Sequence, residues 1–265
     1  MLAERVGDLS HAVWVTAGIV SYALATGGDL DWVVGLMEER LAGDLDPGDR
    51  STFTFLSALI RANRGEAVGT LLDELIALAA GSSDPLDVAS VPSIRATVAL
   101  ASGDLERAIA DALAAVEIAP RLAEEEYPIA IRAALWHGDL LRAREISALL
   151  DALPASGRVM QAGRLTARAG IAALEGRRAD AVSGYREALR RWREIGQLRD
   201  FALCAIDFVT LLGPDEPDAR AAAEEARPIL ERIRARPYLE RLAAALAARV
   251  VPERQPLSTE VAERR

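Results

Sequence analysis

The side chains that could carry chemistry are few and lie far apart in the sequence. The two histidines are His11 and His137, and the single cysteine is Cys204. Cys204 lies in the apolar run FALCAIDF, so we expect a buried, unreactive thiol. His137 directly precedes a glycine, which places it in the last turn of a helix, where an imidazole suits the negative helix end. We give His11, at the start of the first helix, the same structural interpretation. We therefore predict no catalytic, cofactor-binding or metal-binding residue.

Two sets of carboxylates are the remaining candidates for chemistry. Glu124, Glu125 and Glu126 are adjacent, and adjacent side chains of a helix point in different directions, so we interpret them as the acidic start of a helix. Asp207 lies within the apolar run CAIDFVTLL. A lone buried carboxylate is costly, so we expect an arginine of a neighbouring helix to pair with it. A contact with a ligand in a groove is the alternative for Asp207.

The overall charge excludes several classes of function. All 31 basic residues are arginine, so the chain has no P-loop, Schiff-base or kinase-type lysine. We take the absence of lysine as a sign of a GC-rich bacterial genome. The net charge of −9 argues against nucleic acid as a partner. The apolar segment 12–27 follows no positive region and is too short to cross a bilayer, so we expect a buried first helix and a cytoplasmic protein with no membrane contact.

The elements that position these residues are predicted by regularly spaced glycines. The successive differences are 37, 38, 35, 38 and 37 residues, and each glycine follows a stretch compatible with a helix. A constant period of this length indicates an array of repeats. Glycine ends helices readily because it adopts positive φ without a Cβ clash. The six glycines are Gly28, Gly65, Gly103, Gly138, Gly176 and Gly213.

An aspartate follows the glycine in three of these turns, and its side chain can accept a hydrogen bond from the first turn of the next helix. The three are Asp29, Asp104 and Asp139. Pro120 and Pro154 follow the expected ends of second helices, which a proline cannot easily continue. The pattern predicts about six antiparallel helix pairs and one terminal helix near 237–250.

The small residues of the second helices resemble those of the tetratricopeptide repeat (TPR) family, although that family's tryptophan and first glycine in the leading helix are absent. The residues that carry the likeness are Ala108, Ala112, Ala115 and Pro120 in one repeat and Ala181, Tyr185 and Ala188 in another. The resemblance implies an all-α fold, a right-handed TPR-like superhelix (an α-solenoid), over residues 1–250, followed by a polar tail at 251–265. More narrowly, residues 174–242 look like the C-terminal repeats of large bacterial signalling proteins that carry a cyclase or ATPase module. A catalytic domain of a larger signalling protein is therefore one possible partner.

In the TPR family the first helix of each pair faces a concave groove. The register of the glycines then places ten residues there: Tyr22, Thr52, Asn63, Thr97, Glu125, Arg132, Trp136, Thr166, Asp200 and Asp207. The four tryptophans, Trp14, Trp32, Trp136 and Trp192, are expected to pack in the core, with Trp136 open to the groove as the alternative.

We expect a non-enzymatic regulatory scaffold that binds a protein or peptide in this groove. The alternatives are a small-molecule sensor or all-helical enzyme with a pocket at the groove centre, and an RNA-binding repeat, which the acidic charge disfavours. A deep cavity with converging ionisable groups would favour the pocket.

Overall fold

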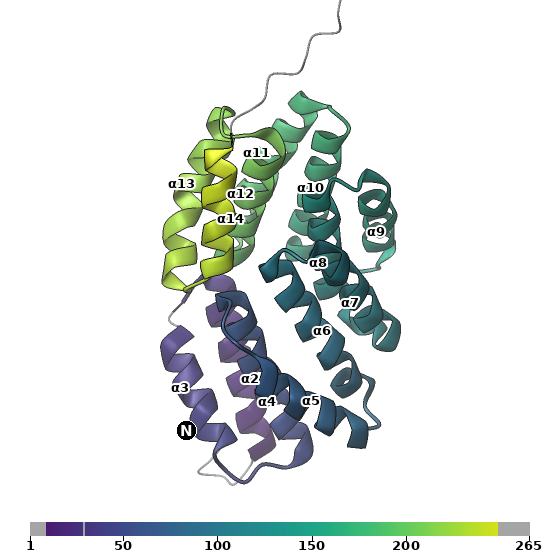
Figure 1. Cartoon of the computed structure of the whole chain (residues 1–265), viewed down its shortest axis with the longest axis vertical. Coiled ribbons are helices and arrows are strands. Elements are labelled where there is room, and N and C mark those ends of the chain that lie inside the picture. Colours follow the sequence, from purple (N-terminus) through teal and green to yellow (C-terminus); the bar gives the residue numbers. More distant parts are fainter. Residues whose placement is uncertain (1–8, 29, 249–265) are drawn as a thin grey trace, which may run out of the picture.

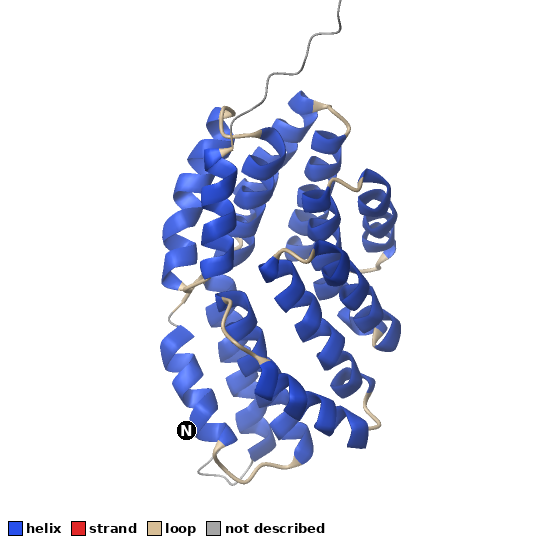
Figure 2. Cartoon of the chain, viewed as in Figure 1, coloured by secondary structure: helices blue, strands red, loops and turns tan. Residues whose placement is uncertain are grey.

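The computed structural model describes residues 9–28 and 30–248, with the side chains of residues 9–14 outside the description (Figure 1). This part of the chain contains thirteen α-helices, one short 3₁₀ helix and no strand, which confirms the all-α prediction (Figure 2). The helices are α2 (Leu9–Thr26), α3 (Leu30–Leu41), α4 (Pro47–Arg64), α5 (Gly69–Gly81), α6 (Pro85–Ser102), α7 (Leu105–Ile118), η1 (Pro120–Leu122), α8 (Ala123–His137), α9 (Leu140–Ala152), α10 (Arg158–Leu174), α11 (Arg178–Glu194), α12 (Leu198–Leu212), α13 (Pro217–Arg232) and α14 (Arg236–Ala247).

Neighbouring helices pack in sequence order, as six pairs followed by α14. The turns use the predicted chemistry. Gly103 and Gly138 end α6 and α8 with φ of 84° and 82°, a conformation that a side chain would strain. The first turn is a correction, because the residue with positive φ there is Gly27, at 65°, and not Gly28. The helix register of the first pair is therefore one residue earlier than the spacing predicts.

The aspartates after the glycines begin the next helices as expected. The carboxylate of Asp104 accepts a hydrogen bond from the backbone N–H of Arg107 at 3.3 Å, and Asp139 does the same for Arg142 at 3.0 Å. These contacts satisfy N–H groups that the first helical turn leaves free. Asp29, the third aspartate of this kind, lies outside the described residues.

The two ends of the array contact one another, which the sequence pattern does not predict. Helix α2 packs against α12, and α14 packs against α4 and α6 as well as α12 and α13. In Figure 1 the purple first helices lie directly below the yellow-green last helices. The largest core cluster joins the apolar side chains of both ends, among them Val20, Phe53, Phe208 and Leu242. Burying these faces against each other removes apolar surface from water that the end helices would otherwise expose.

A buried polar contact fixes this closure. Arg64, at the end of α4, is 7% exposed and donates from Nε to the backbone carbonyl of Ile233 at 3.2 Å. The same side chain forms an ion pair with Asp31 of α3 at 2.9 Å. No helix within the described ranges has the length and apolar character needed to cross a bilayer. The tail predicted at 251–265 lies outside the described residues.

Candidate functional site

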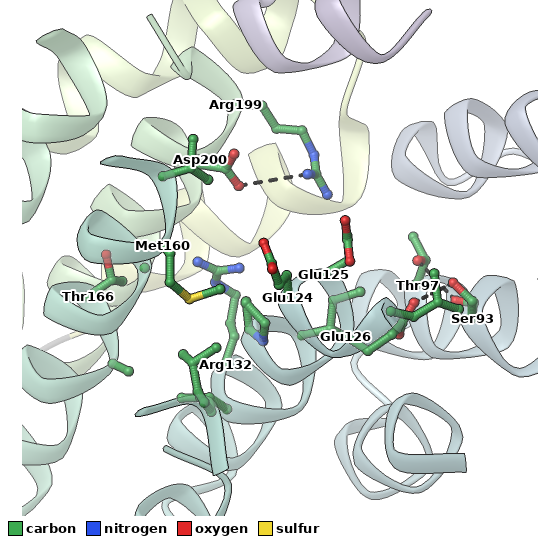
Figure 3. Close-up of a pocket in the computed structure, with 18 of the residues that line it drawn as sticks. Ser93, Thr97, Glu124, Glu125, Glu126, Arg132, Met160, Thr166, Arg199 and Asp200 are labelled. Carbon is green, nitrogen blue, oxygen red and sulfur yellow. Dashed lines mark hydrogen bonds and ion pairs between the residues drawn. The ribbon is translucent and has the colours of Figure 1, made fainter. Parts of the chain in front are cut away.

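The first helices of the pairs surround a cavity of about 470 Å³ (Figure 3). This volume lies in the range of pockets that hold small ligands or peptide side chains. Its walls come from α4, α6, α8, α10 and α12, with single contributions from α2, η1, α9 and α11. Much of the lining is apolar and includes Leu56, Leu59, Ile131, Leu135 and Met160.

The central polar feature of the cavity wall is a buried ion pair between α8 and α12. Nε of Arg132 donates to both carboxylate oxygens of Asp207, at 3.0 and 3.1 Å. The indole N–H of Trp136, one helical turn after Arg132, donates to Oδ1 of Asp207 at 2.8 Å. Asp207 is 1% exposed and Arg132 is 8% exposed. The expectation that an arginine of another helix pairs with Asp207 is confirmed.

Burial and pairing act in opposite directions on this pair. Burial raises the pKa of Asp207, and the N–H donors of Arg132 and Trp136 counteract it. Burial lowers the pKa of Arg132, but the charge and hydrogen bonds of Asp207, together with the charge of Asp200, raise it by more in total, so the guanidinium stays charged. On its other side, Trp136 carries the guanidinium of Arg241 from α14 over its ring, 3.9 Å from the centroid. Helix α14 is thus tied to the cavity wall through Trp136.

Only one edge of the Arg132 guanidinium is used in this pair. Nε makes both contacts with Asp207, and no residue in the described chain accepts a hydrogen bond from either Nη. Figure 3 shows the nitrogens of Arg132 directed into the space between Met160 and Glu124. A guanidinium presents five N–H donors in a fixed fork, so the Nη edge remains available for an acceptor in the cavity.

A second polar contact joins α10 and α11 at the cavity wall. The indole N–H of Trp192 donates to the hydroxyl of Thr166 at 3.0 Å, and that hydroxyl donates to the carbonyl of Ala162 at 3.0 Å. Sγ of Cys204 lies 3.7 Å from the same hydroxyl. Cys204 is fully buried, and burial raises the pKa of its thiol, as expected for an unreactive cysteine.

The acidic start of α8 forms a third part of the cavity. Glu124, Glu125 and Glu126 lie in the first turn, as predicted, but Glu126 points into the protein and is only 2% exposed. It accepts a hydrogen bond from the hydroxyl of Ser93, while its Oε2 has no partner within the described residues. Burial raises the pKa of Glu126 to about 7; Ser93 counteracts this and Glu125 adds to it. Burial also raises the pKa of Glu125.

The interpretation of Glu124 to Glu126 as no more than a helix start misses this buried carboxyl. A signal for it is present in the sequence, because Glu126 precedes Ala130 by four residues and Ala133 by seven. Both alanines are fully buried, so Glu126 continues their helical face. Ser93, Met160 and Arg199 also line the cavity, although the sequence pattern does not predict them there.

Six of the ten residues predicted for the groove line the cavity: Thr97, Glu125, Arg132, Thr166, Asp200 and Asp207. Two more contact lining residues, since Trp136 donates to Asp207 and Asn63 accepts from Arg199 at 3.1 Å.

The other two predicted groove residues do not line the cavity. Thr52 is half-buried and donates to the carbonyl of Gly48. Tyr22 is 71% exposed, and its neighbour Ser21 lines the cavity instead. This is the one-residue register difference already seen in the first turn.

The predicted positions of the tryptophans and histidines are met in some cases and not in others. Trp192 is buried as expected and Trp136 is half-buried at the cavity wall. Trp32 is 58% exposed, so the prediction of core packing is wrong for it. Trp32 lies in the first turn of α3, whose buried stripe is Leu30, Val33 and Met37. His137 ends α8 as expected, with Nε2 3.3 Å from Glu106. The side chains of His11 and Trp14 lie outside the description.

Within the described ranges, no group of three or more histidine, cysteine, aspartate or glutamate side chains is arranged to hold a metal ion. No protein-family model, curated protein or solved structure matches this chain.

Proposed function

We propose that this protein is a non-enzymatic, cytoplasmic regulatory scaffold built as a right-handed TPR-like superhelix, and that it binds a short protein or peptide segment in the cavity. The observation that carries this proposal is the fixed position of Arg132. Its Nε edge is held by Asp207, and its Nη edge faces a cavity of about 470 Å³. A donor that is oriented before a ligand arrives reduces the entropy cost of binding.

The polar groups of the cavity support recognition more than catalysis. Asp207 accepts three N–H contacts, and the hydroxyl of Thr166 is engaged with Trp192 and Ala162. The described residues that line the cavity include neither histidine nor cysteine. Covalent catalysis needs a nucleophile with an adjacent base, and the contacts of these described residues include no such pair.

The contact between the two ends of the array limits the length of the bound segment. Because α14 packs against α4, α6 and α12, it occupies part of the space that an open array would offer to a long extended peptide. The remaining cavity suits one or two side chains and the backbone between them. A catalytic domain of a larger signalling protein is one possible source of such a segment.

A glycine in the cavity wall provides a direct test. Gly163 lies inside α10 and lines the cavity, and a Cβ added there meets no atom within 4 Å. Gly163→Leu should therefore direct a side chain into the cavity from a position where its first carbon displaces no neighbour. Gly35→Leu is the matched control, because Gly35 lies inside α3, is exposed and has equally open surroundings. Peptides selected from a random display library against the wild-type protein should bind Gly35→Leu unchanged and bind Gly163→Leu at least about tenfold more weakly. Selected peptides that bind both variants equally would refute the proposal, as would a library that yields none.

A small-molecule sensor is the second candidate. It is favoured by the raised pKa of Glu126, which lines a cavity of ligand size together with Arg132 and Asp200. The kind of library that yields a ligand separates the two candidates, and Gly163→Leu shows that the ligand occupies the cavity. A metabolite library that raises the melting temperature of the wild type but not of this variant, with no peptide selected, would favour the sensor.

A further inference from the structure

The described carboxylates at the start of α8 differ from most carboxylates on the outer helices in forming no ion pair. On α11, Glu187 contacts both Arg190 and Arg191. By contrast, Glu124 and Glu125 form no ion pair with any described residue, although both line the cavity. The carboxylate of Glu125 accepts a hydrogen bond from its own backbone N–H, and the positive charge of Arg121 partly counteracts the effect of its burial on its pKa. Figure 3 shows their carboxylates directed into it.

The residues that line the cavity carry an excess of negative charge, although Arg121, outside the lining, acts on Glu125. Five acidic and two basic residues line the cavity, a formal balance of −3: Glu124, Glu125, Glu126, Asp200 and Asp207 against Arg132 and Arg199. Both arginines already have partners. Arg132 pairs with Asp207 at 3.0 Å. Arg199 donates to Asn63 at 3.1 Å and lies 3.8 Å from Asp200.

A buried oxygen without a partner points to the same missing group. Oε2 of Glu126 has no hydrogen-bond partner within the described residues, although Glu126 is only 2% exposed. A buried oxygen without a partner costs free energy, which a group supplied by a ligand would recover. Because the pKa of Glu126 is raised to about 7, a cation bound at this oxygen would also favour the ionised carboxylate over the protonated one. The helix dipole favours acidic side chains at this end of α8, but it does not supply the hydrogen bond that Oε2 of Glu126 lacks.

The rest of the cavity defines what must carry this cation. Leu59, Ile129 and Met160 provide an apolar wall for an alkyl stem. The Nη edge of Arg132 provides donors for an acceptor such as a backbone carbonyl. Arg132 is seven residues after Glu125 on α8, a rise of about 10 Å, which a long basic side chain and its hydrogen bonds at both ends can cover.

We propose that the cavity binds a guanidinium or ammonium group on an alkyl stem, with its cation at Glu124, Glu125 and Glu126 and an acceptor at its other end on Arg132. This inference rests on the proposed function, and adds the chemical class of the ligand. An arginine or lysine side chain of a peptide and a free amine such as agmatine share this chemistry. Within it, the peptide source is the one that also supplies the acceptor for Arg132.

Calorimetric titration with matched probes tests the proposal. The probes are acetyl-arginine amide, its uncharged counterpart acetyl-citrulline amide, and agmatine, which lacks the carbonyl. Acetyl-arginine amide should bind at least about tenfold more tightly than the citrulline probe. A peptide source predicts that agmatine binds more weakly than acetyl-arginine amide. Equal binding of agmatine assigns the site to a free amine.

A double variant, Glu124→Gln with Glu125→Gln, should remove the preference for arginine over citrulline. The matched control is Glu224→Gln with Glu231→Gln, which changes the same charge at exposed positions of α13 and should keep the preference. Loss of helix-end stabilisation in the first variant lowers its melting temperature, but lowers the apparent affinity of both probes equally, so the ratio remains informative.

Equal binding of arginine and citrulline probes to the wild type would overturn the proposal, as would the same preference in the double variant or no binding of any probe at about 1 mM. Peptides that still bind the wild type and fail on Gly163→Leu would leave the proposed function standing without this ligand class. If no selected peptide depends on the cavity either, both the proposed function and this ligand class would be refuted.

Discussion

Two arginine–aspartate pairs, one outside and one inside, join neighbouring helices in very different surroundings. Arg186 of α11 pairs with Asp218 of α13, and their side chains are 62% and 37% exposed. Arg132 of α8 pairs with Asp207 of α12, with side chains 10% and 1% exposed. The outer pair is screened by water, so its strength is small and its geometry is easily changed. The inner pair has lost its hydration and depends on each contact that replaces it.

The inner pair therefore contributes to the orientation of its side chains more than to stability. A buried ion pair is seldom more stable than apolar side chains of the same volume, so its presence in an otherwise apolar wall is a cost. That cost is consistent with a site that must hold one guanidinium edge toward a cavity. The outer pairs need no such fixed geometry.

The largest effect should come from breaking the inner pair. Asp207→Ala leaves Arg132 buried without its counter-charge, and should lower the free energy of unfolding by about 3–5 kcal/mol. Asp218→Ala, the outer counterpart, should lower it by at most about 1 kcal/mol. Urea denaturation measures both. Equal losses in the two variants would show that burial does not distinguish the pairs.

The next effect is a pH dependence that originates at Glu126. Burial raises its pKa from 4.5 to about 7, so between these pH values the unfolded chain releases a proton that the folded protein keeps. The free energy of unfolding should therefore fall as pH rises through this window, by about 3 kcal/mol in total. Glu126→Gln removes the titrating carboxyl.

Urea denaturation at about pH 5 and about pH 8 gives the free energy of unfolding of both proteins. Relative to the wild type, the variant should be more stable at the higher pH than at the lower one. A difference between the two proteins that is the same at both pH values would contradict this assignment. Glu117→Gln, at an exposed position of α7, is the control for a simple loss of charge.

A smaller effect should follow from removing one donor to Asp207. Trp136→Phe keeps an aromatic ring at the wall but loses the N–H contact of 2.8 Å, and should cost about 1–3 kcal/mol. Trp32→Phe, at an exposed position, should change the free energy of unfolding by no more than about 0.5 kcal/mol. A neutral result for Trp136→Phe would mean that the indole N–H does not support the pair.

The smallest effect is expected for the outer surface. Arg193 contacts Glu225 at 2.8 and 3.0 Å and lies over the ring of Phe201, 4.9 Å from its centroid. A double-mutant cycle of Arg193→Ala and Glu225→Ala should give a coupling of about 0.2–1 kcal/mol that decreases with added salt. A larger coupling that does not change with salt would mean that this exposed pair behaves like the buried pair of Arg132 and Asp207.

The helix ends could be predicted because they follow local rules. A helix ends where a residue adopts positive φ, and Gly103 and Gly138 do so without cost. Asp104 and Asp139 begin the next helices for an equally local reason. The sequence predicts that Asp207 pairs with an arginine, because a buried carboxylate needs a cation. It does not predict which arginine, and the structure shows Arg132.

The remaining features depend on contacts between distant parts of the chain. Arg64 and Ile233 are separated by 169 residues, and no local pattern around either residue indicates that the two ends of the chain meet. The buried position of Glu126 depends on Ser93, 33 residues earlier, which supplies its hydrogen bond. The register of the first pair was misplaced because two adjacent glycines, Gly27 and Gly28, both fit the spacing.

The most direct test of the cavity as the recognition site uses a methionine already in its wall. Met160 lines the cavity, whereas Met37 is fully buried in α3 away from it. In a protein labelled with ¹³C at the methionine methyl groups, titration with acetyl-arginine amide should shift the NMR signal of Met160 and leave that of Met37 in place. Saturable binding that moves Met37 or neither of these two signals would contradict the account.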